Sequence, residues 1–130
     1  MKRRSIEIEG FKHDNPIPAA SRIGPFVASG GISGKDPETG KIPGGIEEQC
    51  ALAFAHMRRI VETAGGTTED ILKVTVWLKD GAHRKIVNQE WLRMFPDAES
   101  RPARHTFVGL ELAGNTLVQC EFLAVLNGGK

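Results

Sequence analysis

The sequence has few cysteines and no paired histidines, and both absences exclude common kinds of site. Cys50 and Cys120 form no C-x-x-C motif and have no histidine pair nearby, so neither a zinc site nor a thiol–disulfide motif has support. The four histidines are scattered, and none forms an H-x-x-x-H pair with another. We therefore expect no metal, and we expect both cysteines to be small core residues.

The sequence also lacks a long basic run and a long apolar run. Its 17 Lys and Arg oppose 16 Asp and Glu, which gives a net charge of +1 and favours no nucleic acid partner. The basic start at residues 2–4 leads into an alternating strand pattern rather than the apolar core of a signal peptide. No apolar run is long enough to span a bilayer. We expect a cytoplasmic protein with no membrane partner.

The length and composition of the chain fit one globular domain that covers residues 1–130, since 40% of its residues are hydrophobic and 25% are charged. Local patterns predict strands over residues 5–9, 26–29, 73–79, 106–110 and 116–126. Apolar residues at three- and four-residue steps predict a helix from Ile46 to Ala64, which Gly65 and Gly66 end. One stripe of this helix is expected to face the core: Ile46, Cys50, Ala53, Phe54, Met57, Ile60, Val61 and Ala64. Asp80 is expected to cap a second helix, which Pro96 stops and which turns five apolar residues inward: Ile86, Val87, Trp91, Met94 and Phe95.

Turns complete the predicted arrangement. Residues 36–40 read Asp-Pro-Glu-Thr-Gly and predict a reverse turn, and residues 67–70 have the spacing of a capping box. Residues 113–115 read Ala-Gly-Asn and predict an antiparallel hairpin between the last two strands. The resulting order β-β-α-β-α-β-β predicts an α+β fold with two helices on one face of a mixed sheet.

Arg104 is the most informative residue, because it lies in a strand whose alternation otherwise buries apolar side chains. Alternation places Arg104, Thr106 and Val108 on one face of this strand, with residues 105, 107 and 109 on the other. A guanidinium there could hold a carboxylate through two parallel hydrogen bonds. The alternative is an arginine that pairs with an acidic neighbour or extends its head to solvent.

Several fragments, in this order and spacing, resemble one family. They are Ser29-Gly30, Asp36-Pro37-x-Thr39-Gly40, Val74-x-Val76-x-Leu78-Lys79-Asp80, Val87-Asn88 and Pro102-Ala103-Arg104. From about residue 23 to residue 125 the chain resembles the reactive-intermediate deaminase (Rid) family of enamine and imine hydrolases, also called endoribonuclease L-PSP-like. The resemblance implies a chorismate-mutase-like fold assembled as a homotrimer, with three active sites in the clefts between subunits.

The resemblance also implies residue roles. Arg104 matches the family arginine that binds the substrate carboxylate, and Glu121 matches the glutamate that orients the attacking water; Ser29 and Asn88 match residues that line the cleft. Glu121 lies in an otherwise apolar strand, where a carboxylate is costly to bury unless it is paired or used. The alternatives are a structural ion pair of Glu121, with Arg104 itself as one candidate partner, and a helix-surface amide for Asn88.

The chain departs from the family pattern at two places. Thr106 stands where many active members have a cysteine, so a small hydrogen-bonding group replaces a thiol. Residues 23–26 read Ile-Gly-Pro-Phe and imitate the family's Ile-Gly-Pro-Tyr motif, but they lie in the strand that precedes Ser29. The expected counterpart of the family motif is residues 13–18, which contain no tyrosine. These departures bear on the range of substrates.

The function that we predict is hydrolysis of a 2-imino or 2-enamino acid to a 2-keto acid and ammonia. Arg104 would orient the substrate and Glu121 the water, with secondary hydrogen bonds from Ser29 or Thr106, and the resemblance implies no cofactor. The partners are a carboxylate-bearing imine or enamine and further copies of the chain. Three alternatives stay open: a deaminase of an aminomuconate-type ring-cleavage product, a non-catalytic carboxylate-binding trimer, and, ranked last, an RNA-cleaving protein.

Overall fold

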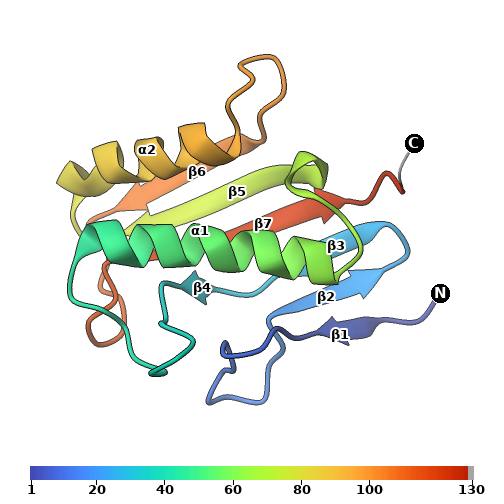
Figure 1. Cartoon of the computed structure of the whole chain (residues 1–130), viewed down its shortest axis with the longest axis horizontal. Helices are drawn as coiled ribbons and strands as arrows, with labels where there is room; N and C mark the ends of the chain where they lie inside the picture. The colour runs from blue at the N-terminus through green and yellow to red at the C-terminus, as the bar shows by residue number, and fades with distance from the viewer. Residues whose placement is uncertain (129–130) are drawn as a thin grey trace.

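The computed structural model describes residues 1–128 and contains two helices and seven strands (Figure 1). Both predicted helices and all five predicted strands are confirmed, with shifted ends, while two short strands were not predicted. The strands are β1 (Arg4–Ile6), β2 (Ala20–Ile23), β3 (Phe26–Ser29), β4 (Ile32–Ser33), β5 (Ile71–Leu78), β6 (Ala103–Val108) and β7 (Val118–Val125). The helices are α1 (Ile46–Thr63) and α2 (Arg84–Met94), and single 3₁₀ turns precede β5 (Thr68–Asp70) and α2 (Gly81–His83).

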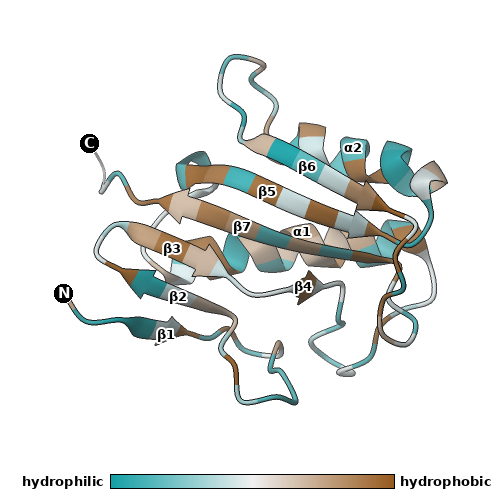
Figure 2. Cartoon of the chain, turned by 180° about the vertical axis from the view of Figure 1, so that it is seen from behind, coloured by the Kyte–Doolittle hydropathy of each residue, from teal (hydrophilic) through white to brown (hydrophobic). Residues whose placement is uncertain are grey.

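All strands belong to one mixed sheet with the order β1-β2-β3-β7-β5-β6, and β4 pairs with the start of β7 beside this path. The pairing of β5 with β6 is parallel, and every other described pairing is antiparallel. Both helices cover the same face (Figure 1), and the view from behind shows the other face without a helix (Figure 2). The prediction of an α+β fold with helices on one face of a mixed sheet is therefore confirmed.

The predicted hairpin between the last two strands is wrong. The turn itself forms, since Gly114 has a φ of 56° and the amide of Thr116 donates to the carbonyl of Ala113 at 3.0 Å. However, β6 and β7 do not pair with each other, because β5 lies between them. The α2 crossover returns the chain parallel to β5, and β7 then takes the free edge of β5 on its other side.

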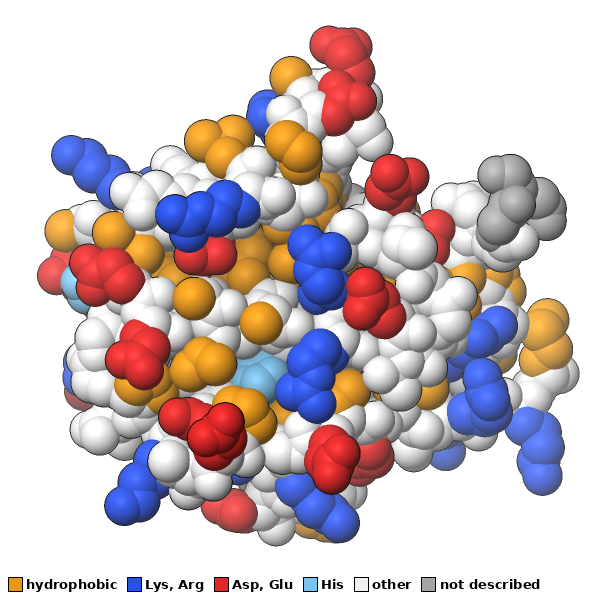
Figure 3. All heavy atoms as spheres, in the orientation of Figure 1, with side chains coloured by type: hydrophobic (Ala, Val, Ile, Leu, Met, Phe, Trp, Pro, Cys, Tyr) orange, Lys and Arg blue, Asp and Glu red, His pale blue; other side chains and the backbone are white. Residues whose placement is uncertain are grey.

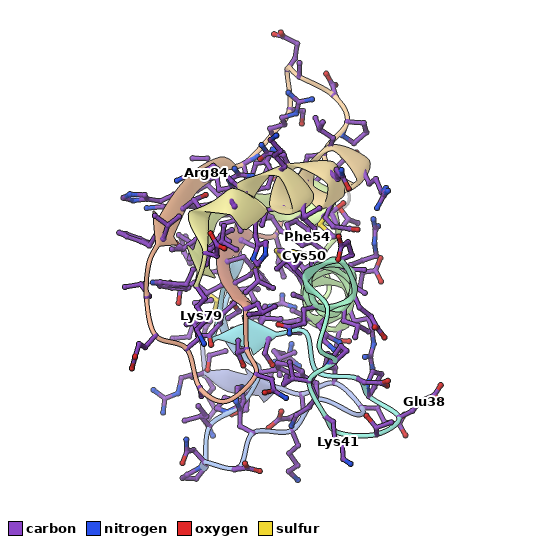
Figure 4. The ribbon with its side chains drawn as sticks, turned by 90° about the vertical axis from the view of Figure 1, so that its left-hand side faces the viewer. Glu38, Lys41, Cys50, Phe54, Lys79 and Arg84 are labelled. Atoms are coloured by element: carbon purple, nitrogen blue, oxygen red, sulfur yellow. The ribbon has the colours of Figure 1, made fainter. Side chains whose placement is uncertain are left out.

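The buried side of α1 matches the predicted stripe. All eight predicted residues are buried: Ile46, Cys50, Ala53, Phe54, Met57, Ile60, Val61 and Ala64. Cys50 and Phe54 lie on this buried side, near α2 (Figure 4). The helix ends before Gly65, whose φ of 107° is a conformation that residues with a side chain rarely adopt.

The start of α2 differs from the prediction. Asp80 does act as a cap, but its Oδ1 accepts the amide of Ala82 at 2.9 Å in the 3₁₀ turn, and the α-helix begins at Arg84. The end before Pro96 is as predicted, and Val87, Trp91 and Phe95 are buried. The helix therefore packs its apolar stripe on the β5–β6 side of the sheet.

Two buried polar residues were not distinguished by the helical pattern. Gln49 is completely buried and connects two loops, because its amide donates to the carbonyls of Pro43 and Asn115 at 2.6 and 3.0 Å. His56 lies 2.6 Å from the carbonyl of Lys35 through Nε2, and burial lowers its pKa. Within residues 1–128 no helix is both long and apolar enough to cross a membrane.

Candidate active site

The first group of candidate residues surrounds Arg104 on β6. Its Nη2 donates a hydrogen bond of 2.8 Å to Oδ1 of Asn88 on α2, and its guanidinium carbon lies 4.9 Å from the centre of the Trp91 ring. Thr106 lies two residues further along β6 and is half-buried on the same face. We call Arg104, Asn88, Trp91 and Thr106 the arginine cluster.

Arg104 is a cation that has no acidic partner among residues 1–128. Within the described residues the one ion pair joins Arg93 to Glu90 at 2.7 Å, and the one hydrogen bond of Arg104 goes to the neutral amide of Asn88. Burial lowers the pKa of Arg104, and the positive charge of Arg84 lowers it further. A guanidinium has five N–H donors, so most of them are free for an anion.

The second group lies around Glu121 on β7. It lines a cavity of about 250 Å³ whose walls are Ala28, Ser29, Lys73, Thr75, Glu121, Phe122 and Leu123. The Ser29 hydroxyl is fixed, since Oγ accepts the amide of Phe122 at 2.8 Å and donates to the carbonyl of Gly30 at 2.9 Å. Glu121 is half-buried, and Lys73 brings a cation to the same cavity. We call this group the glutamate cavity.

These two groups lie on opposite faces of the sheet. Arg104 shares a row with Val74 and Phe122 across β6, β5 and β7, and both of these neighbours are buried under the helices. Glu121 shares the next row with Thr75 and His105. Because adjacent residues of a strand point to opposite faces, these rows face opposite ways. An ion pair between Arg104 and Glu121 within one chain is therefore excluded.

The predicted site residues thus form two sets. The structure brings Arg104, Asn88 and Thr106 together, and it brings Ser29 and Glu121 together in the glutamate cavity. Asn88 is exposed on α2, and its Oδ1 accepts the hydrogen bond from Arg104. Sequence reasoning missed Lys73 and Thr75 as cavity residues, although their alternation in β5 places both on the face that carries Glu121.

The N-terminal segment shows why the apparent family motif is misplaced. Residues 23–26 form the turn between β2 and β3, and Phe26 is 58% exposed on the open face of the sheet. Residues 15–18 instead line a separate cavity of about 230 Å³, together with Ser5, Glu7, Lys12 and His13. No cluster of three or more His, Cys, Asp or Glu side chains that could hold a metal ion occurs within residues 1–128.

Comparison with known proteins connects this geometry to a family. The family model described as endoribonuclease L-PSP matches residues 12–126. A RutC family protein of Aquifex aeolicus is 36% identical over 110 residues, which cover 85% of this chain and 88% of that protein. The chloroplastic Reactive Intermediate Deaminase A of Arabidopsis thaliana is 30% identical over 112 residues, 85% of this chain and 59% of its own length.

A solved structure agrees in fold. The crystal structure of Escherichia coli TdcF with bound serine has a TM-score of 0.86 and 25% sequence identity, and the match covers 94% of this chain and 98% of that one. The fold similarity extends over both groups of candidate residues, since nearly the whole chain is included.

Proposed function

We propose that this chain, which belongs to the endoribonuclease L-PSP family, is a deaminase that hydrolyses 2-imino or 2-enamino acids to 2-keto acids and ammonia. The observation that carries the proposal is Arg104, a half-buried cation whose described partners are an amide and an aromatic ring, without a carboxylate. The name of the Arabidopsis relative and the amino acid bound by TdcF support a ligand with a carboxylate beside a nitrogen.

In this proposal the arginine cluster binds the substrate. The Arg104 guanidinium holds the carboxylate through two charge-assisted hydrogen bonds, which fixes the plane of the adjacent C=N bond. Asn88 and Trp91 keep the guanidinium in place from one side. Thr106 offers a hydroxyl to the bound ligand. Positioning of this kind accelerates a reaction without a covalent intermediate.

The glutamate cavity supplies the water. Glu121 accepts a proton from a water molecule as the water oxygen bonds to the electrophilic C=N carbon of a protonated imine, which gives a carbinolamine. The amine nitrogen then takes up a proton and leaves as ammonia, while the hydroxyl of the carbinolamine loses its proton and becomes the ketone. An enamine first takes a proton on carbon, which gives the same protonated imine. General acid–base catalysis of this type contributes roughly a hundredfold or more.

Because the two groups lie on opposite faces of one sheet, we propose that a complete site combines the arginine cluster of one copy with the glutamate cavity of another. A homotrimer would provide three such sites. Support comes from the open face of the sheet, where Trp77 and Phe107 stack with ring centres 6.2 Å apart and Leu123 is 41% exposed beside the glutamate cavity. A second copy on this face would remove these apolar groups from water.

Other functions rank lower. An aminomuconate-type ring-cleavage product carries a carboxylate that the same arginine would bind, so it stays the nearest alternative substrate. A carboxylate-binding trimer without turnover would need Arg104 but not Glu121. RNA cleavage has the least support, because acidic and basic side chains are interspersed on the helix face and form no continuous basic surface there (Figure 3).

The decisive experiment is steady-state deamination of imines that an amino-acid oxidase generates from several amino acids. Glu121→Gln should reduce kcat on the order of a hundredfold, because it keeps the shape and removes the base, while binding of a 2-keto acid stays measurable. Glu38→Gln is the matched control, since Glu38 lies in the exposed turn of residues 36–40 (Figure 4). Normal turnover by Glu121→Gln would reduce this glutamate to a structural role and favour the non-catalytic trimer.

A further inference from the structure

A second arginine lies on the same side of α2 as the residues that contact Arg104. Arg84, Asn88 and Trp91 are spaced four and three residues apart, so they form one stripe of the helix. Asn88 and Trp91 both contact Arg104, which shows that the stripe faces β6. Arg84 lies at the first position of this stripe, where α2 begins beside β6 (Figure 4).

The direction of α2 places Arg84 further along β6 than Arg104. A Cβ built on Gly81, just before the helix, would lie 3.6 Å from Cγ1 of Val108, so the start of α2 lies over the end of β6. Arg104, Thr106 and Val108 follow one another on this face of the strand. The direction along β6 from Arg104 through Thr106 to Val108 is therefore also the direction toward Arg84. Along α2, Arg84 lies about one helical turn, or roughly 6 Å, beyond Asn88.

No ion pair within residues 1–128 compensates the charge of Arg84. The first turn of α2 contains Arg84 and Lys85 and no acidic residue, the reverse of the usual preference at a helix N-terminus. Asp80, the nearest acid along the chain, uses Oδ1 to cap the amide of Ala82 and makes no ion pair within the described residues. Arg84 also lowers the pKa of Arg104, as expected for two cations close enough to repel each other.

We propose that Arg84 and Arg104 together select a ligand with two carboxylates, namely an imine or enamine that has a second carboxylate at the far end of a short carbon chain. Arg104 binds the carboxylate next to the nitrogen, which rests on the proposed function, and Arg84 binds the distal one. The ligand chain lies along β6 over Thr106. Two unpaired cations on one surface explain the preference, because a dianion relieves their mutual repulsion and a monoanion relieves it only in part.

The test compares two 2-keto acids with the same carbon chain by isothermal titration. 2-Oxoglutarate carries a distal carboxylate, whereas 2-oxopentanoate ends in a methyl group. The wild-type chain should bind 2-oxoglutarate roughly tenfold or more tightly, and Arg84→Gln should remove that advantage while changing the affinity for 2-oxopentanoate far less. Lys85→Gln is the matched control, since it removes the same charge from the next position, which points about 100° away around the helix.

Each outcome has a definite meaning. Equal affinities of the wild type for the two acids, no detectable binding of 2-oxoglutarate, or an equal loss in Lys85→Gln would overturn the selection by Arg84. A preference for 2-oxoglutarate that depends on Arg84, in a protein that deaminates none of the imines tested, would support the binding inference and refute the proposed deaminase. The two proposals therefore fail in distinguishable ways.

Discussion

The guanidinium groups of Arg22 and Arg101 differ from that of Arg104 in what they bind. Arg22 donates from Nη1 to the carbonyl of Ala64 at 2.6 Å, and Arg101 donates from Nε to the carbonyl of Phe95 at 2.8 Å. Both therefore satisfy backbone acceptors at the C-terminal ends of α1 and α2. Arg104 binds no backbone carbonyl in the described part of the chain, so its donors remain available for a ligand.

This difference gives a prediction for Arg104. Arg104→Lys should lose binding of 2-oxopentanoate almost as fully as Arg104→Ala, by roughly tenfold or more, because the planar fork and not the charge alone holds the carboxylate. Isothermal titration and imine kinetics measure the two effects. Arg93→Lys is the control, since Arg93 pairs with Glu90 on the surface. Wild-type affinity in Arg104→Lys would show that two parallel bonds are not needed.

The sequence predicted which candidate residues share a face of one strand better than how candidates on different strands are arranged. Strand alternation correctly put Arg104 and Thr106 on one face, because this relation is internal to β6. It could not relate Arg104 to Glu121, since that depends on the register of β6 and β7 against β5. Trp91 was predicted as a core residue and is 9% exposed, but its contact with Arg104 arises only when α2 packs on β6.

At the scale of elements, local sequence patterns predicted whether a segment forms a helix or a strand. They failed where a strand depends on pairing with strands that are distant in the sequence. The apolar stripe of α1 is a periodic signal within one segment, so all its apolar members were found, whereas buried Gln49 and His56 were not. Residues 20–23 show no clear alternation, and β2 forms because it is held between β1 and β3. The hairpin error has the same origin, because a tight turn does not prevent β5 from lying between β6 and β7.

The contact of α1 with the sheet gives a prediction for the thiols. Cys50 and Cys120 are fully buried on facing sides of α1 and β7, so changing both to alanine should lower the free energy of unfolding by on the order of 1 kcal/mol each and leave kcat/KM nearly unchanged. Chemical denaturation and imine kinetics measure these effects. Complete loss of turnover in a still-folded double variant would contradict the prediction and point to thiol catalysis.

The same thiols give a prediction for pH. Burial raises the pKa of Cys50 from 9.0 to about 12 and raises that of Cys120 as well. In the unfolded chain the thiols ionise near their ordinary pKa of 9.0. The contribution of the buried, protonated thiols to the free energy of unfolding is therefore complete well below pH 9 and decreases as the pH rises toward the folded pKa values. Between pH 8 and pH 10 the free energy of unfolding of the wild type should fall more steeply than that of the double alanine variant. Equal pH dependence of the free energy of unfolding in the two proteins would contradict this prediction.

At the scale of the whole molecule, the helix-free face of the sheet carries exposed apolar side chains that no element of the same chain covers in the described part. His105 and Phe107 stack with ring centres 4.1 Å apart, Phe107 stacks on Trp77, and Phe107 is 40% exposed. Charge does little to oppose association, because the net charge of the chain is only +1. The helix-free face is thus the surface on which we expect further copies of the chain to bind.

For the proposed homotrimer, light scattering coupled to size exclusion should report about three times the 14.2 kDa chain mass. Phe107→Glu should reduce that mass and abolish deamination while circular dichroism stays unchanged, because a charge on the open face would have to be buried between copies. Leu92→Glu is the matched control, since Leu92 is 52% exposed on α2, away from this face. A wild-type monomer at micromolar concentration would refute both the trimer and the shared site, because Arg104 and Glu121 of one chain lie on opposite faces of its sheet.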